Sequence, residues 1–324
     1  MPFNRGHALV IGVSENTSNA SFNDAIAQRD AEAVADVLKQ QDYCGYPTGQ
    51  VTLLKPEQTT KAGIVAALRA LKEQAHDGDT VFLYYSGHGM LGSDGQYYLV
   101  SRDAKIVDGS NGKQQVRKGT GVSEIDLLSV LRDVPAQKML LVFNACFSGK
   151  LAPAFGTREH EAQRTTSSHM LPEESVNALL GSGEGRAVFT ACREQEKSYF
   201  LTKGNTSFFA EALVNALKGK DIVGREDKAS KLSFINLADL YFAVYESVKE
   251  KVESMFNEIQ EPQLSVLKLV GAFPVALYNR QEESAISKVT RGAALVSGLH
   301  VIDKDTAKQA FERRLAQYQN QTDV

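Results

Sequence analysis

A histidine and a cysteine each follow an apolar segment of the sequence at the point where that segment ends. His88 lies between two glycines shortly after residues 80–85, and Cys146 comes two positions after the end of residues 138–144. Apolar runs of this length that break into small residues and glycine are typical of buried strands. A thiol and an imidazole held side by side can act as a nucleophile and its proton-transfer partner. The pair therefore predicts cysteine-based nucleophilic catalysis by His88 and Cys146.

The elements that must position these two residues follow an alternating pattern of strands and helices. Apolar, β-branched segments predict strands at residues 7–13, 51–54, 80–85, 97–100, 138–144 and 186–191. Helical spacing of apolar residues predicts helices at 30–41, after a cap at Thr59 or Thr60, and at 123–131, 207–217 and 234–256. This alternation gives a parallel sheet covered by helices on both faces. Ligands of such sheets bind at the carboxyl ends of the strands, where His88 and Cys146 are both expected.

The stretch from residue 151 to residue 185 is polar and has no steady periodicity, which predicts a long loop. Exposed loops of this kind tolerate cleavage, and Lys150, Arg158 and Arg164 place basic residues in or beside this one. If the chain is processed, we expect the cut here. A last apolar segment ends near Tyr278, and the residues after it have a helical pattern without a motif.

Bulk composition excludes several classes of protein. The chain has 324 residues, 43% of them hydrophobic, which suits one catalytic domain with an appended tail. A net charge of −3 provides no basic surface for nucleic acid. Three cysteines without regular spacing predict neither a disulfide framework nor a zinc site, and they indicate a reducing cytoplasm. No apolar run is long enough to cross a membrane, so a membrane partner is not expected either.

Two motifs carry a resemblance to a known family. The sequences YSGHG at residues 85–89 and NACFSG at residues 144–149 resemble the caspase-like cysteine peptidases, including metacaspases and their bacterial, orthocaspase-like relatives. The resemblance implies a three-layer αβα sandwich with a mostly parallel central sheet. It divides the chain into a peptidase domain at 1–276 and a C-terminal extension of unknown role at 277–324. Within the domain it implies a large-subunit-like part at 1–150, a linker loop at 151–185 and a small-subunit-like part at 186–276.

The resemblance also implies a mechanism. The backbone N–H groups of Gly89 and Cys146 would form an oxyanion hole, with donors placed where charge develops on the tetrahedral intermediate. Cys146 would form a thioester acyl-enzyme, while His88 protonates the leaving amine and later activates water. The expected activity is that of an endopeptidase acting on protein substrates in a regulated proteolytic, stress or defence pathway.

Substrate specificity is carried over from the family onto four residues, namely Asp24, Asp30, Ser86 and Asn144. Asp24 stands where animal caspases hold a pocket arginine, and this inversion of charge favours cleavage after Arg or Lys, as in metacaspases. Asn144 departs from the pattern, because metacaspases carry Asp there and animal caspases Gln. For Asp24 and Asp30, helix capping and first-turn charge are an alternative role. Specificity for Asp or another residue, and a non-catalytic scaffold on the same fold, are the alternative functions.

No cofactor is expected. Many metacaspases need calcium, and Asp103 matches an acidic position of that family, but Asp94 and Asp108 do not build a recognisable calcium loop. No adaptor domain is visible in the sequence, so a regulatory protein partner or the C-terminal extension would have to switch the enzyme.

Overall fold

The computed structural model describes residues 3–109, 112–145, 171–193, 196, 198–200, 205–222, 224–228, 230–267, 273–279 and 298–322, with side chains as far as 317. Cys146, Lys150, Arg158 and Arg164 lie outside the described residues. The helices are α1 Ala25–Lys39, α2 Lys61–Gln74, α3 Glu124–Leu131, α4 Glu173–Gly181, α5 Phe208–Leu217, α6 Leu237–Phe256 and α7 Lys304–Thr322.

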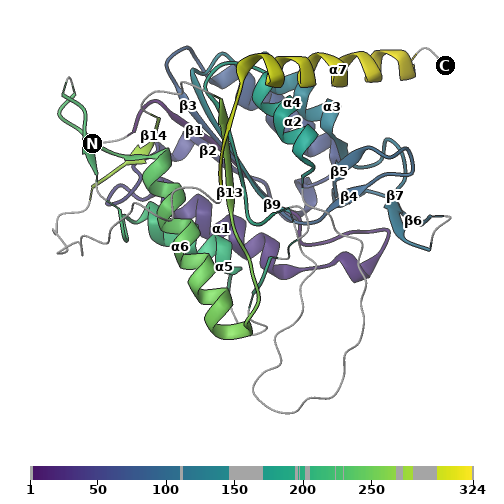
Figure 1. The fold of residues 1–324 in the computed structure, drawn as a ribbon, viewed down its shortest axis with the longest axis horizontal. Coiled ribbons are helices and arrows are strands. Elements are labelled where there is room, and N and C mark those ends of the chain that lie inside the picture. Colours follow the sequence, from purple (N-terminus) through teal and green to yellow (C-terminus); the bar gives the residue numbers. More distant parts are fainter. Residues whose placement is uncertain are drawn as a thin grey trace.

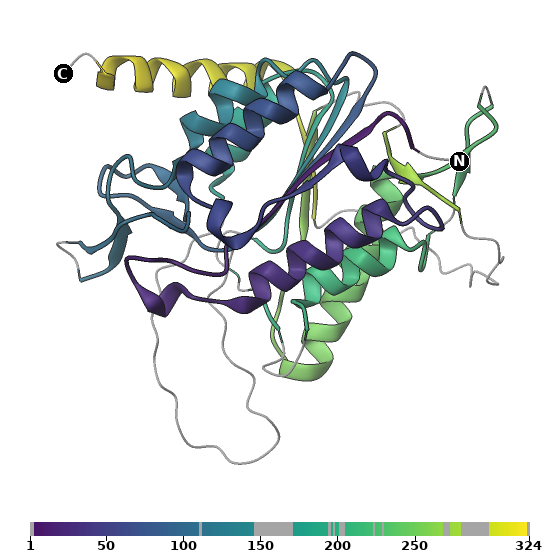
Figure 2. The ribbon, with the colours of Figure 1, turned by 180° about the vertical axis from the view of Figure 1, so that it is seen from behind.

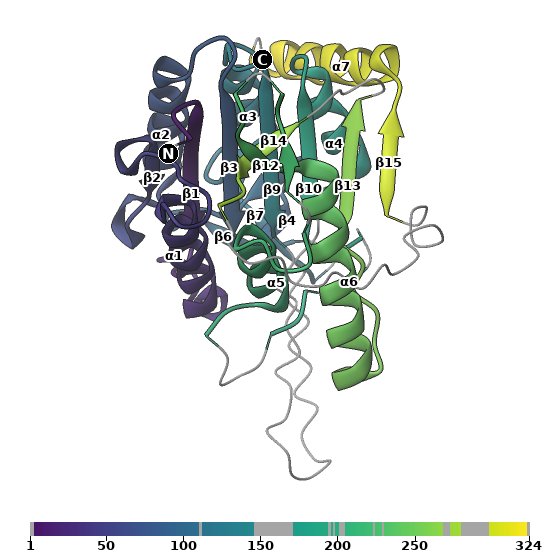
Figure 3. The same cartoon turned by 90° about the vertical axis from the view of Figure 1, so that its left-hand side faces the viewer.

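A central sheet forms the middle layer. Its seven strands are β1 Gly6–Gly12, β2 Val51–Leu53, β3 Thr80–Ser86, β9 Lys138–Asn144, β10 Arg186–Thr190, β13 Gln263–Leu267 and β15 Leu299–Ile302. They lie side by side in the order β15-β13-β10-β9-β3-β1-β2 (Figure 3). Neighbouring strands are parallel except for β10 and β13, which pair antiparallel. The predicted α/β class with a mostly parallel central sheet is therefore confirmed.

Helices cover both faces of this sheet. Helices α1, α5 and α6 lie on one face, and α2, α3, α4 and α7 lie on the other (Figures 1 and 2). Alternate residues of the strands supply the two cores: in β1, Ala8 and Val10 pack with the first set of helices, whereas Leu9 and Ile11 pack with the second. Because both faces of each inner strand are buried, those strands are apolar throughout rather than alternating.

Short polar side chains set the starts of the helices. Thr60 accepts a hydrogen bond from the Gly63 N–H and caps α2, as the sequence predicts. Ser123, predicted only as the first residue of a helix, caps α3. The first helix begins at residue 25 rather than residue 30, because the Asp24 side chain accepts the Ile26 N–H.

Smaller sheets lie around the central one. They comprise β4 Gly89–Leu91, β5 Tyr97–Leu99 and β8 Val122–Ser123; β6 Ile106–Asp108 and β7 Gln114–Val116; and β11 Arg225–Glu226, β12 Ser233–Asn236 and β14 Pro274–Leu277. The strand predicted at 97–100 therefore exists but pairs outside the central sheet. The helix predicted from residue 234 starts at 237, because residues 233–236 pair antiparallel with β14.

The stretch predicted as a loop contains a helix. The prediction is wrong for α4, which buries Val176, Ala178 and Leu179 against the sheet and against α7. The two helices approach closely at Gly181, where an added Cβ would clash with the Ala307 carbonyl oxygen. This packing partner comes from the far end of the chain, so the local sequence gives no sign of it.

The C-terminal residues continue both the sheet and a helical layer. Strand β15 pairs with β13 and extends the central sheet by one strand. Helix α7 lies across α4 (Figure 1), and its Arg314 forms ion pairs with Glu124 of α3 and Glu174 of α4, at 3.3 and 3.2 Å.

Candidate active site

The edge formed by the carboxyl ends of β3 and β9 brings the two motifs together. These strands pair in register, with Ser86 opposite Asn144. Beyond the last pair, the Gly87 N–H donates to the Asn144 carbonyl at 3.2 Å and the Gly89 N–H donates to the Ala145 carbonyl at 2.9 Å. These two hydrogen bonds, one on each side of His88, hold the backbone around His88 against Asn144 and Ala145. Cys146 is the next residue in the sequence but lies outside the described residues.

His88 is a buried imidazole, 7% exposed. Its ring meets the edge of the Phe22 ring, with centroids 5.0 Å apart. Burial lowers the pKa of His88 to about 4, and a hydrogen bond to the backbone of Phe22 opposes that change. The imidazole is therefore neutral at physiological pH, which is the form able to accept a proton from a thiol.

The backbone around His88 is fixed from two directions. The Tyr85 hydroxyl donates to the carbonyl oxygens of His88 and Val100, at 2.9 and 3.0 Å. Gly87 has a φ of 156°, and a Cβ there would lie 2.8 Å from the Tyr85 hydroxyl oxygen. Only glycine fits this turn, which explains the glycine before the histidine.

The Gly89 N–H, predicted to be an oxyanion donor, is engaged in this structure. It donates to the Ala145 carbonyl oxygen rather than facing an open position. For the Gly89 N–H to act as an oxyanion donor, its hydrogen bond to the Ala145 carbonyl oxygen would have to break. The role remains a prediction with this added condition.

Three of the four predicted specificity residues lie in one polar cluster. Asp30 of α1 accepts hydrogen bonds at Oδ2 from Ser86 Oγ at 3.1 Å and from Asn144 Nδ2 at 2.9 Å. Ser207, predicted only as the start of a helix, completes the cluster: its N–H donates to Asp30 Oδ1 and its Oγ to Asp30 Oδ2, both at 2.8 Å. All four side chains are fully buried.

The cluster also holds a hydroxyl without a hydrogen-bond partner among the described residues. Tyr84 is fully buried, and its hydroxyl lies close to the Asn144 and Ser86 side chains without hydrogen-bond geometry to either. Burial and the negative charge of Asp30 raise the pKa of Tyr84. An unpaired buried hydroxyl beside a buried carboxyl is a costly arrangement that a polar ligand group would relieve.

Asp30 differs from the other buried acids in its partners. Asp79 pairs with His7, Glu124 with Arg314, Asp239 with Arg225, and Glu261 with Arg193 and Lys249. Asp30 has only neutral donors among the described residues, and burial raises its pKa to about 7.

Asp24 does not join this cluster. Its side chain caps α1, and burial raises its pKa. The capping role that the sequence leaves open for Asp24 is therefore the one observed, while its negative charge still contributes to the raised pKa of Asp30.

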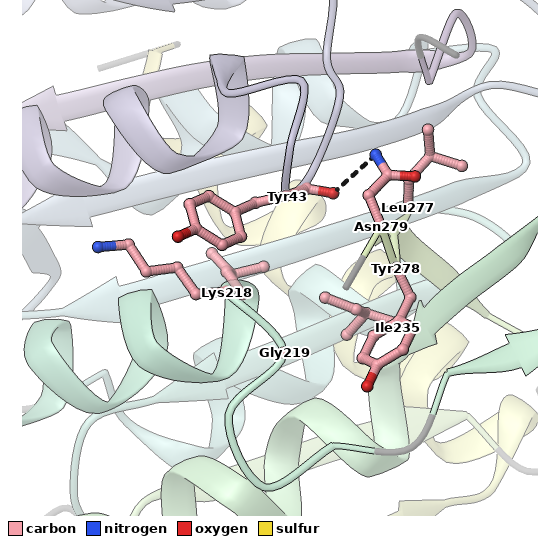
Figure 4. Close-up of a pocket in the computed structure, with 8 residues that line it drawn as sticks. Tyr43, Lys218, Gly219, Ile235, Leu277, Tyr278 and Asn279 are labelled. Carbon is pink, nitrogen blue, oxygen red and sulfur yellow. Dashed lines mark hydrogen bonds between the residues drawn. The ribbon is translucent and has the colours of Figure 1, made fainter. Parts of the chain in front are cut away.

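Two hollows lie elsewhere. The shallow one in Figure 4 lies among Tyr43, Lys218 and Asn279, near the amino-terminal edge of the sheet, and has no room for a water molecule. A cavity of about 490 Å³ lies beside α4 and the strands β10, β13 and β15; it is lined by Leu171, Glu173, Val176, Asn177, Thr190, Cys192, Arg193, Glu196, Gln263, Ser265, His300 and Ile302. Neither includes His88 or Asp30.

The described residues also bear on metals and membranes. They contain no group of three or more His, Cys, Asp or Glu side chains arranged to hold a metal ion. Asp103, the acidic position matched to the family, accepts the Lys61 N–H at 2.8 Å at the start of α2. Within the same part of the chain, no helix combines the length and apolar character that crossing a bilayer needs.

Comparison with known proteins shows the family of the chain. The family model described as Caspase domain matches residues 5–274. The crystal structure of caspase-1 from Spodoptera frugiperda aligns with a TM-score of 0.52 and 15% identity, over 85% of this chain and 93% of that one.

A crystal structure of a protein from Geobacter sulfurreducens aligns with a TM-score of 0.49 and 14% identity, over 80% of this chain and 92% of that one. A search of curated proteins returned no match. The family match spans most of the sequence and includes both motifs. The chain therefore belongs to the caspase-domain family of cysteine peptidases.

Proposed function

We propose that this protein is a cysteine endopeptidase that uses His88 and Cys146 to cleave protein substrates after Arg or Lys. The single observation that carries the specificity is Asp30, a fully buried acid that lacks a basic partner among the described residues. A buried carboxylate is unfavourable unless a cation or several hydrogen bonds compensate its charge. The cluster supplies the hydrogen bonds, and a substrate guanidinium or ammonium would supply the cation.

The catalytic step follows from the protonation state of His88. A neutral imidazole takes the proton of the Cys146 thiol as the sulfur attacks the scissile carbonyl carbon. The resulting imidazolium gives that proton to the departing amine, which leaves a thioester. His88 then removes a proton from water, the hydroxide displaces the Cys146 thiolate from the thioester, and the imidazolium returns its proton to that thiolate. The imidazolium is favoured during the reaction because the adjacent thiolate or oxyanion raises the pKa that burial has lowered.

The location of Asp30 links the two parts of the proposal. Ser86 contacts Asp30 and lies two residues before His88, while Asn144 contacts Asp30 and lies two residues before Cys146. A side chain bound at Asp30 would therefore place the adjoining peptide bond near the reactive groups. Binding of a substrate side chain beside the reactive groups is an effective means of orienting the scissile bond.

A non-catalytic, scaffolding role is the second candidate. Two observations favour it: the Gly89 N–H is already engaged by Ala145, and the Asp30 cluster is closed to solvent in this arrangement. In the enzyme both would have to open when substrate binds.

A fluorogenic peptide panel distinguishes the candidates. Peptides with Arg, Lys, Asp or citrulline before the cleaved bond would be tested with the purified chain and with Cys146→Ala. We expect efficient cleavage after Arg and Lys, cleavage after citrulline that is slower by about a hundredfold, none after Asp, and no cleavage of any peptide by the variant. Asp-directed cleavage would overturn the specificity, and the absence of any cleavage that depends on Cys146, with and without calcium or a regulatory protein, would favour the scaffold.

The proposed setting is a reducing cytoplasm and a regulated proteolytic, stress or defence pathway. Cys44 is a buried, free thiol, and the three cysteines of the chain have no regular spacing, which supports a reducing compartment. Calcium dependence is tested by the same panel with calcium and with a chelator.

A further inference from the structure

A buried glutamine outside both motifs reaches toward the Asp30 cluster. Gln260 is fully buried and lies three residues before β13. Because β13 runs antiparallel to β10, with Gln263 opposite Thr190, residues just before β13 lie beside residues just after β10. Gln260 is thereby brought to the same edge of the sheet as His88.

Each end of the Gln260 amide has a defined partner. Its Oε1 accepts the Tyr199 N–H at 2.9 Å. Its Nε2 donates to the Ala191 carbonyl oxygen at 2.9 Å and to Ser198 Oγ at 3.4 Å. A glutamine with three buried partners has a fixed amide orientation.

The next link in the chain is Ser198. Its hydroxyl donates to Asn144 Oδ1 at 3.1 Å, and it accepts from Gln260. With Gln260 as donor, the single Ser198 proton is directed toward Asn144. The Asn144 amide must then present its oxygen to Ser198 and its nitrogen to the opposite side, where Nδ2 donates to Asp30 and to Ser207 Oγ, both at 2.9 Å.

We propose that Gln260 is a positioning residue for substrate specificity: through Ser198 it fixes which end of the Asn144 amide faces Asp30. This inference rests on the proposed function, in which Asp30 binds the basic side chain of the substrate. Without the Gln260 donor, the Ser198 hydroxyl is free to turn, and the Asn144 amide is free to place its oxygen against the Asp30 carboxylate. That orientation removes a donor from Asp30 and adds a repulsive contact.

The neighbouring residue anchors the surrounding backbone independently. The Glu261 N–H donates to Glu196 Oε2 at 2.8 Å, and the Glu261 carboxylate forms ion pairs with Arg193 and with Lys249, the latter at 3.3 Å. The segment after β10 thus keeps an attachment when the Gln260 donor is lost. The positioning role of Gln260 can therefore be tested without unfolding this edge of the sheet.

The test compares two variants with a matched control. Gln260→Glu keeps an acceptor for the Tyr199 N–H and removes the donor to Ser198, and Ser198→Ala removes the relay itself. Gln263→Ala alters a glutamine three residues away, whose side chain contacts His300 instead. For each, kcat and KM would be measured with an Arg peptide and with its citrulline counterpart, which has nearly the same shape but no charge.

We expect each of the two variants to lower kcat/KM for the Arg peptide by about tenfold, mainly through KM, which is the loss typical of one hydrogen bond to a charged group. The citrulline value should change less, and the control should match the wild type. The double variant should be scarcely worse than the poorer single variant, because both act on Asn144. Equal losses on both peptides, or additive losses, would overturn the proposal.

A second readout does not depend on peptide cleavage. The side-chain amide signal of Asn144 would be assigned in nitrogen-15 NMR spectra by its loss in Asn144→Asp. We expect this signal to shift in Gln260→Glu and Ser198→Ala but not in Gln263→Ala. An unchanged signal in the first two variants would overturn the positioning role. If instead the wild type shows no preference for Arg while the signal shifts as expected, the proposed specificity fails and the contact between Gln260 and Asn144 stands.

Discussion

Two buried carboxyl groups of this protein, Asp30 and Glu124, differ in how their charge is compensated. Both accept hydrogen bonds from serine hydroxyls: Ser207 and Ser86 in the first case, and Ser175 in the second. Glu124 also faces Arg314, whose Nε lies 3.3 Å from its Oε1. Asp30 faces only neutral donors in the described part of the chain.

The difference separates a structural acid from a candidate binding acid. Burial raises the pKa of both groups, and the Arg314 cation lowers that of Glu124 again. The chain compensates Glu124 with a cation of its own, in the contact between α3 and α7. At the carboxyl edge of the sheet, under the proposed function, the cation of the substrate would compensate the charge of Asp30. A buried ion pair that lacks one partner is expected to be unfavourable by several kcal/mol, so the missing cation at Asp30 is a substantial driving force for ligand binding.

The largest expected effect tests whether this edge is catalytic. Cys146→Ala and His88→Ala should each reduce kcat for peptide cleavage by roughly a thousandfold or more, since the nucleophile and its base act as a unit. The double variant should be scarcely worse than either. Circular dichroism and thermal melting provide the control for folding.

Cleavage that survives in Cys146→Ala would end the assignment of the nucleophile. Multiplicative losses in the double variant would mean that His88 and Cys146 do not act together. The assignment of this edge of the sheet as catalytic would then have to be withdrawn.

Removal of the Arg314 cation that pairs with Glu124 tests whether Glu124 is a structural acid. Arg314→Met should destabilise the fold by about 2–4 kcal/mol, because it leaves Glu124 buried and unpaired, and Glu124→Gln in the same chain should restore part of the loss. Urea denaturation measures both changes. Lys308→Met is the matched control, since Lys308 lies on the same helix with a side chain that is 66% exposed.

A control variant as unstable as Arg314→Met would show that α7 tolerates no such substitution, whatever its contacts. An Arg314→Met chain as stable as the wild type would remove the contrast between Glu124 and Asp30.

The pH dependence of stability provides a smaller effect at Asp30 itself. The folded protein holds this proton up to about pH 7, whereas an unfolded aspartate releases it near pH 3.8. Asp30 therefore destabilises the fold progressively as pH rises from about 4 to about 7, by at most about 4 kcal/mol, and not further above that range. The free energy of unfolding of the wild type minus that of Asp30→Asn should fall over this interval, as measured by urea denaturation at several pH values. A difference that is constant from pH 4 to pH 8 would contradict the buried, unpaired state of Asp30.

The sequence predicts the parts of the fold whose signals are local. The strands and helices around His88 have their own apolar periodicity, and the cap of α2 at Thr60 is one of the two residues predicted for it. Strand β15 was missed because it is four residues long and is stabilised by pairing with the distant β13. Helix α4 has a local signal that the prediction overlooked, with two acids in its first turn and Val176, Leu179 and Leu180 at helical spacing.

The candidate site divides in the same way. Asp30, Ser86 and Asn144 were predicted from motif positions, and the structure brings them together. Ser207 carries a helix-capping signal, which explains its Oγ contact with the Ala210 N–H but not its two hydrogen bonds to Asp30. Gln260 carries no local signal at all, because its place depends on the antiparallel pairing of β13 with β10.

The most direct test of the account measures how far Asp30 determines the preference for a positive charge. The ratio of kcat/KM for an Arg peptide to that for its citrulline counterpart would be compared between the wild type and Asp30→Asn. We predict that the wild type prefers Arg by about a hundredfold, the value of one buried charge pair of about 3 kcal/mol, and that the variant loses nearly all of this preference. The absolute rate on citrulline serves as the control for catalysis. An Asp30→Asn enzyme that still prefers Arg to the same extent would contradict the central claim that Asp30 awaits the substrate cation.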